Sequence, residues 1–246
     1  MAESSSSVRE VLSELRGAQK SSSGAPAYSR FVNRPIGRVL AAFAYRFGLR
    51  PDQVTLLSAL ATFTGIALIA LAPPTAAMPL LIVLLLVLGY ALDSADGQLA
   101  RLRGGGSPQG EWLDHVVDAT KIATMHLAVL VCWWRFYAVD AQLLLIPLAF
   151  QVISSVFFFG VILTELLRRG SSSPQSRSRS YRTSPLYSLL VLPADYGLLI
   201  VLFALLGIPW LFIPLYSLLC AANGLILLAS LVRWHRSLGT AAGDHA

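Results

Sequence analysis

Residues 78–99 read MPLLIVLLLVLGYALDSADGQL, a long apolar run that ends in two aspartates three positions apart. A hydrocarbon core about 30 Å thick needs about 20 mostly apolar residues in a helix, and this stretch has that length. It therefore predicts a membrane-spanning helix with Asp93 and Asp96 at one end. The composition agrees, because 55% of the 246 residues are hydrophobic and only 13% are charged, whereas soluble proteins average about 25% charged residues.

Five further apolar runs lie on either side of this stretch. Breakers separate several of them, namely Pro73-Pro74, the glycine-rich stretch 104–108 and Gly207-Ile208-Pro209. The sequence therefore predicts an all-α integral membrane protein with six transmembrane helices, at about 54–71, 78–99, 114–137, 142–167, 186–206 and 210–234.

An amphipathic basic segment precedes the first predicted span. Between residues 28 and 47, apolar residues such as Phe31 and Phe43 are interleaved with arginines such as Arg34 and Arg38. This pattern is typical of a helix that lies in the plane of the lipid headgroups. We therefore divide the chain into a polar cytoplasmic N-terminal segment (1–27), a membrane domain (28–236) and a C-terminal tail (237–246).

The basic residues are distributed unevenly between the two sides of the predicted bundle. The N-terminal segment, the loop with Arg101 and Arg103, the stretch 168–182 and the C-terminal tail carry nearly all of them, and the opposite loops carry little beyond Arg135. The positive-inside rule then places both termini and the Arg101 loop in the cytoplasm, with the chain in the cell membrane. Topology and anionic lipid account for the net charge of +6, so we do not expect a nucleic-acid partner.

A second pair of aspartates follows the first across a short loop. Asp93 and Asp96 share one helical face, and Asp114 and Asp118, four residues apart at the start of the third predicted span, share another. Because the two helices are antiparallel neighbours, the faces can meet at the cytoplasmic interface. Carboxylates gathered there repel one another unless cations neutralise them. Oxygen ligands without His or Cys favour Mg²⁺, Mn²⁺ or Ca²⁺ over zinc.

Small residues and an arginine lie beside these carboxylates. Gly97 and Ala100 leave bare backbone where a flat ligand can approach, and Arg101 offers a planar fork for phosphate oxygens. Phosphoryl transfer depends mainly on positioning and charge neutralisation, which such a site supplies. The alternative, that the aspartates only cap helix ends in water, explains one or two of them but not two spaced pairs on adjacent helix ends.

The complete spacing D-x2-D-G-x2-A-R-x8-G-x3-D-x3-D, from Asp93 to Asp118, resembles the signature of the CDP-alcohol phosphotransferase (CDP-alcohol phosphatidyltransferase) family, and every specified position matches. The resemblance implies a CDP-alcohol donor, often CDP-diacylglycerol, that binds at the cytoplasmic interface and releases CMP. It also implies a homodimer and two Mg²⁺ or Mn²⁺ ions. The implied metal ligands are Asp93, Asp96, Asp114 and Asp118, with Asp118 also the base that deprotonates the acceptor hydroxyl. The implied nucleotide-binding residues are Thr55, Asp93, Gly97, Ala100, Arg101 and Gly110.

The segment before the first predicted span departs from the family at one position. Family members commonly show Pro-Asn-x-Val-Thr there, and this chain has Pro51-Asp52-Gln53-Val54-Thr55. The departure leaves the role of Asp52 open, whereas Thr55 keeps its expected contact with the nucleotide.

Three further polar residues are candidates for binding the acceptor. Lys121 faces nearly the same way as Asp118 and is expected either to hold the acceptor's phosphate or to pair with an aspartate. Arg168 ends the fourth predicted span, where a snorkelling topology residue is the competing interpretation. Asp195 lies in or near the fifth span, where acceptor recognition or an arginine partner would explain it.

The resemblance implies an enzyme of phospholipid synthesis that transfers a substituted phosphate from CDP-diacylglycerol to a polar alcohol such as inositol phosphate or glycerol phosphate. The alternative is a choline- or ethanolamine-phosphotransferase-like reaction, in which the CDP carries the headgroup and the lipid is the acceptor, because residues 110–115 (GEWLDH) look somewhat like that branch. A cation transporter is a third hypothesis. It is disfavoured because the carboxylates cluster at one membrane face instead of lining a path across.

Overall fold

The computed structural model describes residues 12, 14–15, 27–75, 77–170 and 192–243, and these residues contain helices and no strand. Five of the described helices are long and apolar enough to cross a membrane. They are α3 (Pro51–Leu71), α4 (Met78–Leu102), α5 (Pro108–Cys132, continued by the π-helical turn Trp133–Tyr137), α6 (Leu145–Gly170, preceded by the 3₁₀ turn Ala141–Leu144) and α9 (Pro209–Gly243). The predicted all-α membrane fold is thus confirmed.

The fifth predicted span, 186–206, is described only in its second half. A 3₁₀ turn (Leu192–Ala194) precedes α8 (Tyr196–Leu202) and a further 3₁₀ turn (Phe203–Leu205). The apolar helix Tyr196–Leu205 reaches roughly 15 Å at 1.5 Å per residue, about half of a hydrocarbon core. The first part of the predicted span lies outside the described residues, so the count of six stays a prediction.

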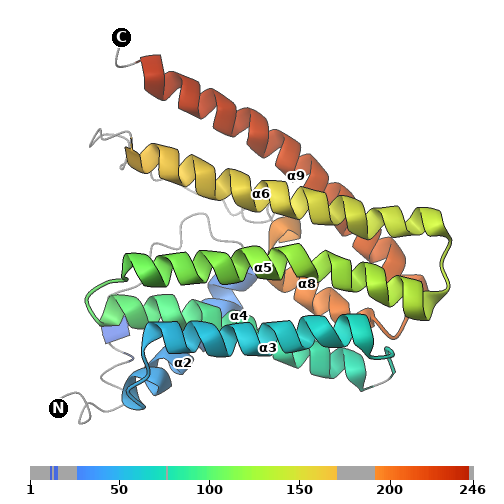
Figure 1. Ribbon diagram of the computed structural model, residues 1–246, viewed down its shortest axis with the longest axis horizontal. Coiled ribbons are helices and arrows are strands. Elements are labelled where there is room, and N and C mark those ends of the chain that lie inside the picture. The colour runs from blue at the N-terminus through green and yellow to red at the C-terminus, as the bar shows by residue number, and fades with distance from the viewer. Residues whose placement is uncertain (1–11, 13, 16–26, 76, 171–191, 244–246) are drawn as a thin grey trace.

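The turns between the helices alternate between the two ends of the bundle (Figure 1). At one end, the Tyr137 hydroxyl donates a hydrogen bond to the Leu206 carbonyl, and a Cβ added at Gly207 would lie 3.2 Å from the Pro74 carbonyl oxygen. These contacts bring the α3–α4, α5–α6 and α8–α9 turns together. The α4–α5 connection lies at the opposite end, which is the arrangement that the predicted topology requires.

The amphipathic segment before α3 is helical, as predicted. It consists of the π-helical turn η2 (Ser29–Asn33) and α2 (Arg34–Arg46). A small-residue face packs on α4, where a Cβ at Gly37 would lie 2.8 Å from the Ser94 Cβ. The opposite face exposes apolar side chains, such as Phe31 and Phe43. An exposed apolar stripe with interleaved arginines suits the lipid headgroup region.

Close packing of α3 on α4 sets the position of the aspartate-bearing helix. A Cβ at Gly89 would lie 2.1 Å from Thr62 Oγ1, and the Ser58 hydroxyl donates a 2.8 Å hydrogen bond to the Gly89 carbonyl. Small residues at such crossings let helix backbones approach closely in lipid, where packing and interhelical hydrogen bonds drive association. Tyr90 follows Gly89 along α4, and Asp93 lies about one turn further on.

Candidate active site

The short connection between α4 and α5 places the two pairs of aspartates at the same end of the bundle. Gly104 and Gly105 adopt φ values of 93° and 128°, a region that glycine enters without steric cost. Ser107 then caps α5 by accepting a 3.0 Å hydrogen bond from the Gly110 N–H, and Pro108 opens the helix. The reversal sets the end of α4 beside the start of α5.

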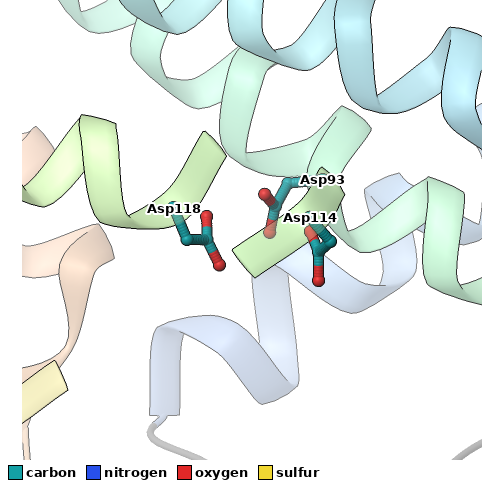
Figure 2. Close-up of side chains that lie close together, drawn as sticks. All are labelled: Asp93, Asp114 and Asp118. Carbon is teal, nitrogen blue, oxygen red and sulfur yellow. The ribbon is translucent and has the colours of Figure 1, made fainter. Parts of the chain in front are cut away.

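Three carboxylates meet at this junction. Asp93 from α4 and Asp114 and Asp118 from α5 each offer one oxygen, and these oxygens all lie within 4.8 Å of one another (Figure 2). Oxygens this close can share a divalent cation after small side-chain adjustments. The predicted meeting of the two helix ends is therefore present, and the role of the three residues as metal ligands stays a prediction.

Asp96 does not belong to this group of three. Its buried carboxylate accepts a 2.7 Å hydrogen bond from the Thr55 hydroxyl on α3. A buried carboxylate needs a donor, and Thr55 is the one that the packing of α3 on α4 supplies. The structure thus differs from the expectation of four carboxylates in one cluster, although Asp96 and Asp114 line the same two cavities. Its role as a metal ligand stays a prediction.

Lys121 supplies positive charge to the cluster. Its side chain is buried, and the ammonium group donates to Asp93 Oδ1 and, at 3.0 Å, to Asp118 Oδ1. Of the two roles that the sequence left open for Lys121, the ion pair is the one present here. Such a pair offsets part of the repulsion among carboxylates at the edge of a low-dielectric region.

A cavity of about 550 Å³ opens beside the cluster, between α3, the end of α4 and the start of α5. Five of the six residues predicted to bind the nucleotide line it: Thr55, Gly97, Ala100, Arg101 and Gly110. The sixth, Asp93, lines a neighbouring cavity. A Cβ added at Gly97 would meet only Arg101 Nη1, at 3.5 Å, so this stretch of helix offers an open surface to a ligand.

The sequence profile of CDP-alcohol phosphatidyltransferases matches residues 49–235, most of the chain, including all of this site. The chain belongs to that family. The phosphatidylinositol phosphate synthase of Corynebacterium glutamicum is 34% identical over 134 residues, which cover 52% of this chain and 57% of the relative. The alignment therefore spans little more than half of that enzyme's length.

Solved structures of Mycobacterium tuberculosis phosphatidylinositol phosphate synthase share the fold of this family member. One has CDP-DAG bound, and the other is in complex with manganese and citrate. Each is 23% identical in sequence with a TM-score of 0.51, and the match covers 85% of this chain and 93% or 88% of the solved chain. At this identity the likeness shows the fold alone.

Several residues of the phosphatidyltransferase cavity were not predicted from the sequence. Arg50, Asp52, Arg103 and Glu111 also line it. Asp52 replaces the family's common asparagine, and its Oδ1 lies 3.1 Å from the position of a Cβ added at Gly110. The sequence singled out Asp52 only as a departure from the family pattern. The other three are next to or near a motif residue, and this adjacency was the only signal that could have indicated them.

Two of the three candidate acceptor residues, Lys121 and Asp195, are held by contacts within the protein. The Asp195 carboxylate accepts hydrogen bonds from the backbone N–H groups of Tyr28 (2.9 Å), Ser29 (3.3 Å) and Gly197 (3.0 Å), so it caps α8 and ties it to the segment before α2. Arg168 lies in the last turn of α6, and its side chain is outside the described part of the chain. Their acceptor role stays a prediction.

A mostly apolar cavity of about 320 Å³ lies next to Lys121 and Asp195, between α5, α6 and α9. His126 lines it, with Nδ1 2.6 Å from the Tyr216 hydroxyl and Nε2 2.9 Å from the Ser154 hydroxyl. No sequence pattern indicated this buried network, because a single histidine in an apolar run does not reveal its partners.

Proposed function

We propose that this phosphatidyltransferase transfers a substituted phosphate from CDP-diacylglycerol to a polar alcohol such as inositol phosphate or glycerol phosphate, with release of CMP, in phospholipid synthesis. The observation that carries the proposal is that the cavity with the predicted nucleotide-binding residues adjoins the carboxylate cluster. The cavity lined by Thr55, Gly97, Ala100, Arg101 and Gly110 includes Asp114, a member of the carboxylate cluster. The names of the Corynebacterium and Mycobacterium relatives support the same donor and class of acceptor.

The clustered residues fit a hard divalent cation. Asp93, Asp114 and Asp118 offer oxygens only, within 4.8 Å of one another, which suits Mg²⁺ or Mn²⁺. We propose that these three and Asp96 hold two such ions. Bound there, the ions would neutralise the charge of the diphosphate and stabilise CMP as it leaves.

The side chains of the protein supply the remaining functions. Asp118 accepts the proton of the acceptor hydroxyl, and the Lys121 ammonium group, 3.0 Å from its Oδ1, fixes its orientation. Thr55 holds the Asp96 carboxylate in place, and the Arg101 guanidinium group binds phosphate oxygens. A site at the end of the bundle lets a lipid donor keep its acyl chains in the bilayer while its head reaches water.

We also propose an orientation in the membrane and an oligomeric state. We propose that both termini and the active site face the cytoplasm, because the basic residues gather at that end of the predicted spans. We also propose a homodimer, on the family resemblance alone.

A screen of donors and acceptors tests the activity. Purified protein with Mg²⁺ or Mn²⁺ is given CDP-diacylglycerol with inositol phosphate or glycerol phosphate, or CDP-choline or CDP-ethanolamine with diacylglycerol, and CMP is measured. We expect metal-dependent CMP release from CDP-diacylglycerol with a phosphorylated polar alcohol.

Two other outcomes of the screen would change the proposal. CMP release confined to CDP-choline or CDP-ethanolamine would establish the alternative reaction, in which the lipid is the acceptor. No CMP release from any pair, together with metal-ion flux into vesicles that contain the protein, would replace the enzyme by a transporter.

A further inference from the structure

A short piece of the N-terminal segment packs on the end of the bundle that carries the aspartates. Of residues 1–26, the structure describes Leu12, Glu14 and Leu15, and all three are helical. Glu14 is exposed, whereas Leu15 is only 1% exposed. These residues precede the stretch 49–235 that the family profile matches, and the reaction described above gives them no function.

The sequence around Leu15 favours a short amphipathic helix. Its apolar residues recur at the spacing of one helical face: Val8, Val11, Leu12 and Leu15. Ser7 and Glu10 have the spacing of a capping box at a helix start, and Gly17 stands where a helix commonly ends. The two described residues of the apolar face both pack against the bundle. This packing explains why leucines stand in a segment that is otherwise polar.

Leu15 completes a buried cluster to which three other helices contribute. We call it the leucine–alanine cluster, and its other buried members, from α2, α3 and α4, are Ala41, Ala42, Ala44, Val54, Ala95 and Leu99. Four of these seven residues are alanines, so Leu15, Leu99 and Val54 supply most of its apolar volume. Because protein interiors are close-packed, removal of a buried leucine leaves a void or lets its neighbours shift.

The leucine–alanine cluster adjoins the nucleotide cavity along the chain. Val54 is followed by Thr55 and Leu99 by Ala100, and both Thr55 and Ala100 line that cavity. Thr55 also donates the 2.7 Å hydrogen bond that holds Asp96. The packing of Val54 against Leu99 in one cluster therefore sets the spacing between two walls of the cavity.

A second connection runs through an aromatic ring. Tyr45 from α2 and Leu102 from α4 pack against the same cluster. The guanidinium carbon of Arg103, which directly follows α4, lies 5.8 Å from the centroid of the Tyr45 ring. Arg103 lines the nucleotide cavity, where its charge can attract a diphosphate. The position of this charge thus depends on a residue that the cluster holds.

We propose that Leu15 is a positioning residue, whose docking on the leucine–alanine cluster holds α3, α4 and Arg103 in the arrangement that binds the nucleotide of the donor. The proposal rests on the function proposed above and adds a control of its donor affinity from outside the family domain. Coupling between two binding events is reciprocal. Docking of Leu12 and Leu15 must therefore tighten when the donor binds.

Substitutions at position 15 test the first half of this coupling. Leu15→Ala removes the packing, and Leu15→Met, which fills nearly the same volume, is the conservative variant. The matched control is Leu206→Ala, because Leu206 is also fully buried but lies beside the α8–α9 turn at the opposite end of the bundle. Glu14→Ala controls for a change on the exposed face of the same segment.

The kinetic measurement separates positioning from general loss of stability. Leu15→Ala should raise the KM for CDP-diacylglycerol roughly fivefold or more, the lower end of typical couplings between sites, with kcat and the acceptor KM unchanged. Leu15→Met and Glu14→Ala should match the wild type. Leu206→Ala should lower the thermal unfolding midpoint without a change in the donor KM. An unchanged donor KM in Leu15→Ala, or an equal rise in Leu206→Ala, would overturn the proposal.

Maleimide labelling of purified protein tests the reciprocal half and does not need Leu15→Ala to fold. Leu12→Cys carries the thiol on the packed face and Glu14→Cys on the exposed face, and the two cysteines of the wild type are buried. Leu12→Cys should react more slowly than Glu14→Cys. Addition of CDP-diacylglycerol with Mg²⁺ should slow Leu12→Cys severalfold further and leave Glu14→Cys unchanged.

The outcomes distinguish this inference from the proposed function. If the wild type releases CMP from CDP-diacylglycerol but the donor does not slow the labelling of Leu12→Cys, only the positioning role is wrong. Equal labelling rates of Leu12→Cys and Glu14→Cys without donor would show that the segment is not docked, which also overturns it. If the wild type neither binds CDP-diacylglycerol nor releases CMP, the proposed function fails, and the positioning role fails with it.

Discussion

Asp118 contributes one of three carboxylates that share a small volume with a single lysine. The Lys121 ammonium group is bound to Asp118 and to Asp93, so Lys121 keeps a partner if Asp118 loses its charge. The neighbouring carboxylates also repel the negative charge of Asp118, so removal of that negative charge should not destabilise the fold. The role of Asp118 as a base can therefore be tested without unfolding the protein.

Asp118→Asn is expected to retain donor binding and lose turnover. Asparagine has nearly the same shape but cannot take a proton, and the loss of a general base typically lowers rates by about 10²- to 10⁴-fold. CMP release and binding of CDP-diacylglycerol are the two measurements. Asp140→Asn, at an exposed aspartate in the turn before α6, is the control. CMP release near the wild-type rate would remove Asp118 as the base.

The sequence predicted the meeting of residues whose positions depend on local geometry. Spacings of three and four along two antiparallel helices were enough to bring Asp93, Asp114 and Asp118 together. Local spacing could not predict the hydrogen bond between Asp96 and Thr55. The two residues are 41 positions apart, and their contact depends on how α3 packs on α4.

At the scale of elements, Asp195 connects two segments that are far apart in the sequence. Its carboxylate accepts from Gly197 at the start of α8 and from Tyr28 and Ser29 before α2. Gly197 is needed at this junction, because a Cβ there would lie 2.0 Å from the Tyr28 ring. The junction holds the start of α2, and with it Arg34, against the bundle.

Asp195→Asn should loosen this junction. The amide has one oxygen in place of two and presents an NH₂ group to backbone donors, so at least one N–H loses its partner at a cost of about 1–3 kcal/mol. Hydrogen exchange should rise at the amides of Tyr28, Ser29 and Gly197 while α3 and α4 stay protected. Asp140→Asn is again the control, because Asp140 caps its turn without a side-chain hydrogen bond. Unchanged exchange at all three amides would contradict the tether.

Elements were predicted well where length or periodicity determines them. Apolar runs gave α3, α4, α5, α6 and α9, and the amphipathic pattern gave α2. The fifth span was harder, because the described part is broken into 3₁₀ and α-helical turns around Asp195. The length of an apolar run does not predict where a helix is interrupted. These interruptions depend on Pro193 and on the contacts of Asp195 with another segment.

At the scale of the whole molecule, the side of the membrane that the α4–α5 connection faces determines which compartment supplies the acceptor. The α4–α5 connection beside the aspartates lies at one end, and the α3–α4, α5–α6 and α8–α9 turns lie at the other (Figure 1). The chain leaves the second end along α6, and α8 leads back to that end before α9 begins (Figure 1); the sixth crossing between them stays a prediction. By the positive-inside rule, we expect the aspartate end to face the cytoplasm.

Single cysteines introduced into three turns test this orientation and the sixth crossing together. Gly106→Cys lies in the α4–α5 connection, where an added Cβ meets open space. Asp140→Cys and Ile208→Cys lie at exposed positions of the α5–α6 and α8–α9 turns. The wild type is the background control, because its two cysteines, Cys132 and Cys220, are free but buried. The reagent is a thiol-reactive maleimide that does not cross membranes.

In intact cells, Asp140→Cys and Ile208→Cys should be labelled and Gly106→Cys should not, because only the first two turns face outward in the proposed orientation. Gly106→Cys should become reactive once the membrane is permeabilised. Labelling of Gly106→Cys alone in intact cells would reverse the orientation and put the active site outside. If Ile208→Cys instead behaved like Gly106→Cys while Asp140→Cys stayed accessible, the segment before α9 would not cross. The prediction of six spans would then be wrong. The prediction that the C-terminal tail lies in the cytoplasm, on the same side as the active site, would be wrong with it.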